Sequence, residues 1–147
     1  MNSLKRQSTV LWVQSKISLA EQETGVMFKA KYSYFPATIV VKSILKPLDP
    51  KFKIDSLPRD MAKAHLGRPN VDLKSHGLTT VGPYKAAEVV YDNKRRGKNY
   101  VNHILAIPMR YQTFIITLSA LKNNKTADLQ KKFTAIAQGL LTEIMSQ

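Results

Sequence analysis

Residues 111–145 read YQTFIITLSALKNNKTADLQKKFTAIAQGLLTEIM, and they contain the two patterns that decide the fold class. In the second part of this stretch, apolar residues recur at spacings of four, three, four and four, which is the period of one helix face. These residues are Leu129, Phe133, Ile136, Leu140 and Ile144. The pattern predicts an amphipathic helix over Thr126–Met145, with Thr126 as its N-cap and its apolar stripe packed on a sheet.

Residues 111–121 alternate with a period of two instead, which indicates a β-strand. One face of this strand carries Phe114, Ile116, Leu118 and Ala120, and Ile115 on the other face is apolar as well. A sheet that is apolar on both faces needs cover on both faces. Further strands are predicted in the part of the sequence before residue 111. They span residues 9–19, 26–34, 37–45, 71–78, 84–92 and 100–107.

Two of the predicted strand pairs are hairpins, and each has a turn that contains a glycine. Gly25 supplies a positive φ in a turn at residues 21–25, so that the first two strands form one hairpin. Gly97 reverses the chain at residues 94–98, which form the tip of a second hairpin. A third turn is predicted at residues 81–83.

The region between the hairpins contains a buried strand and a short helix. The β-branched run within residues 37–45 predicts a strand buried on both faces. A helix is predicted over residues 56–66, with Ser56 as its N-cap. We expect residues 1–8 to be a flexible N-terminus and residues 9–147 to form a single domain.

The order of elements predicts the α+β fold class. Consecutive strands joined by short turns pair antiparallel, so the sheet is expected to be mainly antiparallel. The long C-terminal helix is expected to cover one face of this sheet. The short helix and the loops are expected to cover part of the other face.

Four parts of the chain carry a resemblance to a known family. The sequence VGPYKAAEVVY at residues 81–91 has a glycine-containing turn, a strand with small residues and a final aromatic residue. A hairpin, the segment YQTFIIT at residues 111–117 and a terminal helix follow in order. Over residues 37–145, this arrangement resembles the Mog1/PsbP-like superfamily. The resemblance implies an α/β/α sandwich without catalysis, a role in protein binding or assembly, and, for a bacterial member, export behind a removed lipoprotein leader.

The charge of the chain limits the kinds of partner that it would bind. The 147 residues include 23 Lys and Arg against 10 Asp and Glu, for a formal net charge of +13. This charge favours nucleic acid, anionic lipid head groups or an acidic protein. The basic residues are mostly single, with one dense cluster, NKRRGKN, at residues 93–99. No helix-turn-helix, RNP-like or zinc-finger pattern accompanies it.

The hairpin tip is the strongest candidate for a binding element. It carries four cations within five residues: Lys94, Arg95, Arg96 and Lys98. They could hold an acidic partner or phosphates through charge-assisted hydrogen bonds, or they could simply be a solvated turn. Three tyrosines are predicted near the tip, either as contact area for a partner or as packing at strand edges. These are Tyr84, Tyr91 and Tyr100.

The sequence lacks the patterns that are typical of catalysis, metal binding or cofactor binding. There is no cysteine, no G-x-S-x-G motif and no glycine-rich phosphate loop. The three histidines, at positions 65, 76 and 103, have no metal-ligand spacing. Glu88 and Asp92 share one strand face, where an acid/base pair is conceivable. Cross-strand pairing with Lys98 or another hairpin cation is favoured over that role.

We therefore expect a non-enzymatic protein-binding or assembly-accessory module, acting as a subunit of or a factor for a larger complex. A basic nucleic-acid-binding domain that contacts phosphates is the alternative, and a small enzyme with a cavity between sheet and helix is the least favoured interpretation. No apolar run is long enough to span a membrane. A periplasmic or exported location is expected if a leader has been removed, and a cytoplasmic location otherwise.

Overall fold

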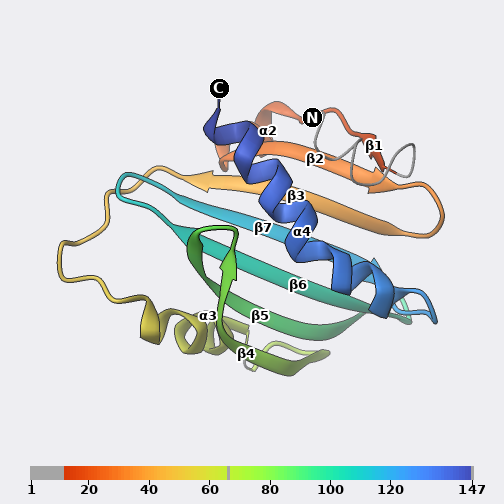
Figure 1. Cartoon of the computed structure of the whole chain (residues 1–147). Helices are drawn as coiled ribbons and strands as arrows, with labels where there is room; N and C mark the ends of the chain where they lie inside the picture. Colours follow the sequence, from red (N-terminus) through yellow and green to blue (C-terminus); the bar gives the residue numbers. More distant parts are fainter. Residues whose placement is uncertain (1–11, 66, 147) are drawn as a thin grey trace.

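The computed structural model describes residues 12–65 and 67–146, and a seven-stranded antiparallel sheet dominates it (Figure 1). The strand order is β1-β2-β3-β7-β6-β5-β4. The strands are β1 (Trp12–Gln14), β2 (Val26–Tyr32), β3 (Ala37–Ile44), β4 (Val71–Val81), β5 (Tyr84–Arg95), β6 (Lys98–Pro108) and β7 (Thr113–Leu121). The helices are α2 (Leu19–Glu23), the 3-10 turn η2 (Ile54–Ser56), α3 (Leu57–His65) and α4 (Thr126–Met145). The predicted α+β class is confirmed.

Three predictions concern residues outside this description. They are the flexible N-terminus over residues 1–8, the start of the first strand at residues 9–11 and the end of the short helix at Leu66.

The main core lies between one face of the sheet and α4. Residues that pair directly across strands point to the same face, and the pairs Val41↔Ile116 and Leu105↔Ile116 bring three buried side chains together there. From the helix side, Phe133 is fully buried on this face. The apolar stripe predicted for α4 is confirmed. Its first four members are buried and its last, Ile144, packs against the margin of the core.

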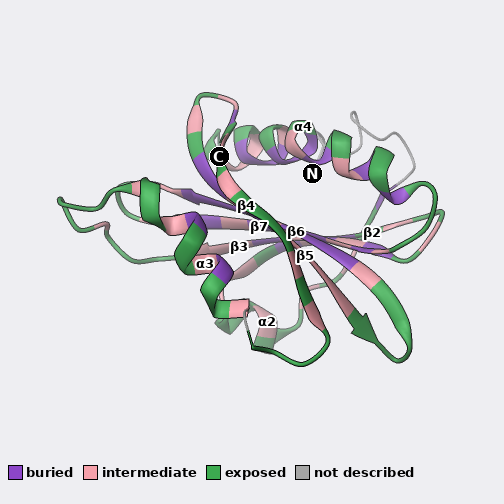
Figure 2. Ribbon diagram, turned by 90° about the horizontal axis from the view of Figure 1, so that it is seen from below, coloured by how far each residue is buried: buried purple, intermediate pink, exposed green. Residues whose placement is uncertain are grey.

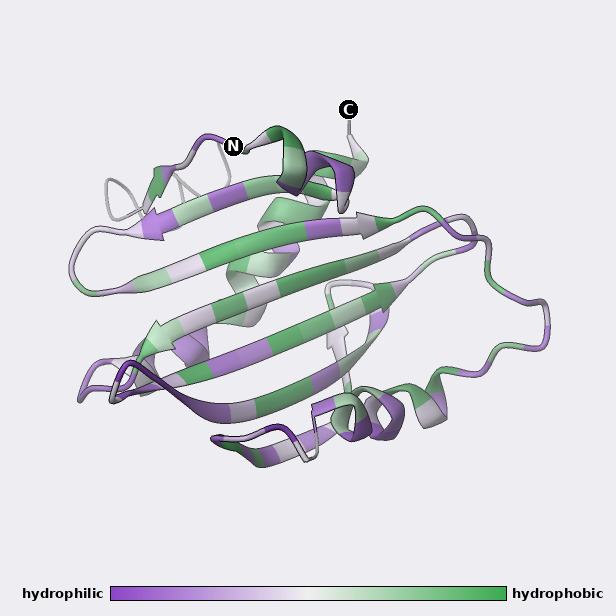
Figure 3. Cartoon of the chain, turned by 180° about the vertical axis from the view of Figure 1, so that it is seen from behind, coloured by the Kyte–Doolittle hydropathy of each residue, from purple (hydrophilic) through white to green (hydrophobic). Residues whose placement is uncertain are grey.

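The opposite face of the sheet, which we call the open face, is covered only in part. Figure 2 shows α4 on one side of the sheet and both α2 and α3 on the other. On the open face, the helix α3 contacts β4 and β5, whereas no described helix covers β3 and β7 (Figure 3). The prediction that residues 37–45 are buried on both faces is therefore wrong. Ile39 is buried under α4, but Val40 on the open face is only half-buried.

The N-terminal hairpin differs from the predicted one. The strand predicted over residues 9–19 is described only as the short β1, and the turn predicted at residues 21–25 begins within α2. A capping box explains the helix, because the Ser18 hydroxyl accepts a hydrogen bond from the Glu21 amide and the Glu21 carboxylate accepts one from the Ser18 amide, both at 3.1 Å. β1 still pairs antiparallel with β2. Gly25 has the predicted positive φ, at +96°.

The beginnings of the other two α-helices also differ in detail. Ser56 directly precedes α3 but is the last residue of the turn η2. Lys125, not Thr126, is the N-cap of α4, so the prediction for Thr126 is wrong. The Thr126 hydroxyl instead donates to the Leu121 carbonyl at 2.8 Å and accepts from the Asn123 amide at 2.9 Å. This side chain therefore ties α4 to the loop that precedes it.

Candidate anion-binding pocket

The β5–β6 hairpin has a tight turn that places an arginine in a strained conformation. The two strands continue so far that only Arg96 and Gly97 connect them. Both have a positive φ, of +52° and +79°, as a two-residue type I′ turn requires. Gly97 makes the reversal as predicted. A positive φ costs a residue with a side chain about 1–2 kcal/mol, so Asn or Gly would suit position 96 better than Arg.

The four predicted cations are all exposed at this end of the hairpin, but they do not point the same way. Arg95 and Lys98 pair directly across the two strands and lie on the open face. Lys94 precedes Arg95 in the same strand and therefore points to the opposite face. Like charges directly opposite each other are destabilising. An anion on the open face would relieve the repulsion between Arg95 and Lys98.

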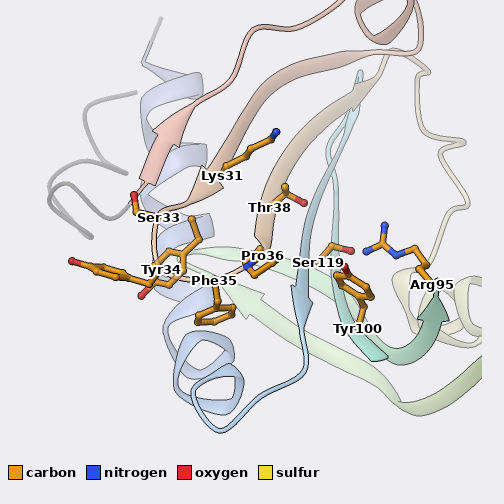
Figure 4. Close-up of a pocket in the computed structure, with 11 residues that line it drawn as sticks. Lys31, Ser33, Tyr34, Phe35, Pro36, Thr38, Arg95, Tyr100 and Ser119 are labelled. Carbon is orange, nitrogen blue, oxygen red and sulfur yellow. The ribbon is translucent and has the colours of Figure 1, made fainter. Parts of the chain in front are cut away.

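A pocket of about 550 Å³ adjoins this part of the hairpin (Figure 4). Arg95 and Tyr100 form one wall, with the guanidinium carbon 4.1 Å from the centre of the tyrosine ring. Residues 33–36, in the β2–β3 turn, form the facing wall. Phe35 in that turn packs against Tyr32, with ring centres 5.1 Å apart. Each wall of the pocket therefore includes an aromatic ring that packs against a neighbouring side chain.

Polar side chains from three neighbouring strands form the floor of the pocket. Lys31 pairs with Thr38, and Thr38 pairs with Ser119, so these three lie in one row across β2, β3 and β7. The row continues to the buried Asn102 of β6, whose side-chain oxygen accepts a hydrogen bond from the Ser119 hydroxyl. The Asn102 amide group donates to Asn93 at 2.8 Å. This network fixes the orientation of Ser119 in the floor.

The three predicted tyrosines are not a cluster. Tyr100, which was predicted near the tip, lines the pocket. Tyr91 is half-buried beside α3 and stacks on His65, with ring centres 4.5 Å apart, and burial raises the pKa of its phenol. Tyr84 is at the far end of the 12-residue β5, where it packs on the main core, so the prediction that it lies near the tip is wrong. An extended strand of this length separates the two ends by about 35 Å.

The two β5 carboxylates were expected to pair across strands with Lys98 or another hairpin cation, and in the described residues neither of them pairs with Lys98. Glu88 contacts the buried His103 of β6, with Oε2 2.7 Å from Nε2. Asp92 accepts from Lys122 at 2.7 Å, and Lys74 is 3.8 Å away. Both carboxylates lie on the face toward α4, whereas Lys98 lies on the open face. The two carboxylates therefore form separate ion pairs or hydrogen bonds, and they do not act on a common substrate position.

The Glu88–His103 contact leads to a prediction about acid stability. The hydrogen bond with His103 lowers the pKa of Glu88, while partial burial opposes this shift. A lowered folded-state pKa stabilises the protein above the unfolded value of about 4.3, and this contribution is lost as pH falls through the lower folded value. Replacing Glu88 with Gln should therefore lower the free energy of unfolding at neutral pH and flatten its decrease between about pH 5 and pH 3. Urea unfolding across this pH range measures both effects, and a parallel pH profile for the variant would contradict the assignment.

No pocket was predicted at the hairpin, and only some of the residues that line it had been named as candidates for binding. Arg95 and Tyr100 were predicted, but Lys31, Thr38 and Ser119 were not. The alternation of β2 did place Lys31 on the face opposite Phe28. No local signal indicated that β3 pairs with β7, and this pairing brings Lys31 and Ser119 into one row.

The described residues show neither a metal centre nor a membrane-spanning helix. Within residues 12–65 and 67–146, no three His, Asp or Glu side chains come together as ligands for a metal ion. None of the helices in the described part of the chain has the length and apolar character needed to cross a bilayer.

Comparison with known proteins shows the fold and not the family. No protein-family model matches the chain, and no curated protein matches it. The chain is similar to PA94, a protein of unknown function from Pseudomonas aeruginosa for which a regulatory role has been suggested. The TM-score is 0.55 at 18% identity, and the match covers 88% of this chain and 93% of PA94. It is also similar to LpqN of Mycobacterium tuberculosis, which is involved in cell envelope biogenesis. Here the TM-score is 0.57 at 15% identity, with 86% of this chain and 75% of LpqN covered.

Proposed function

We propose that the chain is a non-enzymatic binding module that holds an acidic segment of a partner protein between the β2–β3 turn and the β5–β6 hairpin. The observation that carries this proposal is the composition of the pocket. Its described lining contains the cations Lys31 and Arg95, hydroxyl groups and aromatic rings, but no carboxylate. A partner carboxylate could accept charge-assisted hydrogen bonds from both cations, and the aromatic rings offer contact area around it.

The same lining favours binding over turnover. A serine nucleophile needs an adjacent base, and the described lining residues include no His, Asp or Glu. The Ser119 hydroxyl is engaged with Asn102. The pocket can therefore recognise an anion, but it has no group arranged to activate a nucleophile.

An accessory role in a larger assembly belongs to this proposal. The Mog1/PsbP-like resemblance of residues 81–91 and 111–117 supports it, because that superfamily functions in protein binding and assembly. The similarity in fold to LpqN, a protein of cell envelope biogenesis, supports a location in the cell envelope.

A charge-matched pair of variants tests the proposal. The probe is a fluorescent peptide of about eight glutamates, and anisotropy at low salt reports its affinity. Replacing Lys31 and Arg95 together with Ser should weaken binding about tenfold or more, because the peptide loses both cations of the pocket. Replacing Lys85 and Lys131 with Ser removes the same charge from exposed positions outside the pocket, and it should weaken binding less than about threefold.

Two results would contradict the proposal. Equal losses in the two variants would mean that the peptide responds only to net charge. Tighter binding of a DNA duplex, with a steep salt dependence that both variants reduce equally, would instead favour the nucleic-acid alternative.

A further inference from the structure

Two neighbouring loops lie at the end of the sheet opposite the hairpin tip. Residues 45–53 connect β3 to η2, and residues 109–112 connect β6 to β7. The Leu48 amide donates to the Arg110 carbonyl at 3.0 Å, so the two loops are in contact. Figures 1 and 3 show them extending together from the same end of the sheet. We call these two loops, with the adjoining Ile44, the loop end.

Large apolar side chains are exposed at the loop end. Leu45 is 82% exposed and Tyr111 is 65% exposed, and Ile44 and Phe52 are also exposed. A single exposed apolar residue is ordinary, but several at one end of a molecule mark an interaction site. A mainly apolar pocket of about 390 Å³ is lined by both Ile44 and Phe52. These two exposed side chains therefore continue into a larger apolar surface.

Cations alternate with these apolar side chains. Four exposed basic residues belong to the two loops: Lys46, Lys51, Lys53 and Arg110. The only acidic residue in the loops is Asp49, whose carboxylate accepts a hydrogen bond from the Lys51 backbone amide at 2.8 Å. The Arg110 guanidinium carbon is 5.2 Å from the centre of the Tyr111 ring. The loop end thus presents positive charge and apolar side chains on the same surface.

We propose that the loop end docks on the surface of an anionic lipid bilayer. Such a surface has negative head groups next to an apolar layer, and it therefore matches both features at once. Leu45 and Tyr111 enter the interface, and the four cations lie among the head groups. Each cation near an anionic membrane contributes about fivefold in affinity, so binding is reversible and decreases with salt.

This docking goes beyond the proposed function and is compatible with it. The loop end and the hairpin tip lie at opposite ends of β5 and β6, about 35 Å apart. A molecule bound through the loop end holds its anion-binding pocket away from the bilayer. The pocket is then free to bind a partner protein.

Vesicle sedimentation with the full chain tests the docking. The chain should sediment with vesicles of phosphatidylcholine containing about 30% phosphatidylglycerol, and its affinity for phosphatidylcholine alone should be lower by about twentyfold or more. Replacing all four loop cations with Ser should lower the affinity for the anionic vesicles about twentyfold or more. The matched control replaces Lys85, Lys125, Lys131 and Lys132, which are exposed elsewhere, with Ser. This control has the same net charge and should lose less than about threefold.

Insertion is tested separately, by fluorescence. The chain has no cysteine, so Leu45→Cys and Tyr34→Cys each provide one site for an environment-sensitive label. Both native side chains are exposed, which keeps the core intact in the variants. The label at position 45 should brighten and shift to the blue on anionic vesicles, whereas the label at position 34, beside the anion-binding pocket, should not change.

Three results would overturn the docking proposal: no sedimentation with anionic vesicles, equal losses in the two quadruple variants, or an unchanged label at position 45. The proposed binding of acidic segments depends on Lys31 and Arg95, which neither quadruple variant alters, and Tyr34→Cys, in a wall of the pocket, is used only for the label. The glutamate peptide can therefore bind normally when vesicle docking fails, and the reverse also holds.

Discussion

Replacing Phe133 with Ala should lower the free energy of unfolding by about 3–5 kcal/mol. The Phe133 ring is fully buried in the main core and lies edge-on to His103, with ring centres 4.8 Å apart. Removing it leaves a cavity between α4 and the sheet that the surrounding strands cannot close. Urea unfolding measures the loss.

An exposed neighbour on the same helix provides the control. Lys132 precedes Phe133 and is exposed, so Lys132→Ala should change stability by less than about 0.5 kcal/mol. A loss below about 1 kcal/mol for Phe133→Ala would mean that α4 contributes little to the stability of the sheet.

Replacing Gly25 with Ala should cost about 2–4 kcal/mol, through two effects. Gly25 has a φ of +96°, which disfavours any residue with a side chain. A Cβ atom there would also lie 2.4 Å from the Ser43 carbonyl oxygen, which belongs to the backbone of β3 and cannot rotate away. Thermal or urea unfolding measures the effect.

A comparison with Gly97→Ala separates the cost of the positive φ from the cost of the clash with Ser43. The φ of Gly97 is +79°, but an added Cβ would meet nothing within 4 Å. Gly97→Ala should therefore cost only the conformational part, about 1–2 kcal/mol. Equal losses for Gly25→Ala and Gly97→Ala would show that the close approach of Gly25 to β3 does not matter.

The elements with a strong local pattern could be predicted from the sequence. The stripe of α4 repeats over five apolar residues, and a helix packed on a sheet must show this period on its buried face. The β5–β6 hairpin was predicted because Gly97 lies between two alternating segments. By contrast, α2 has only five residues, too few for a helical period, and its sole signal was the capping box from Ser18 to Glu21.

Only those residues of the candidate site that are close to one another in the sequence could be predicted. Arg95 and Tyr100 belong to one hairpin, so the cluster of charges identified them. Lys31, Thr38 and Ser119 reach the pocket because β3 pairs with β7, and strand order is a property of the whole sheet. The pairing partners of Glu88 and Asp92 were missed because they depend on the face that each residue occupies and on a distant lysine, Lys122.

The pairing of β3 with β7 also has a consequence for how the chain folds. β1–β3 form one group of sequence neighbours and β4–β7 form another, and among the described strands β3 with β7 is the only pair that joins the groups. Ala37 pairs with Ala120 and Ile44 pairs with Thr113, so about half of the chain lies in the loop that this seam closes. Such non-local contacts slow folding. The seam, rather than either hairpin group, should therefore limit the folding rate.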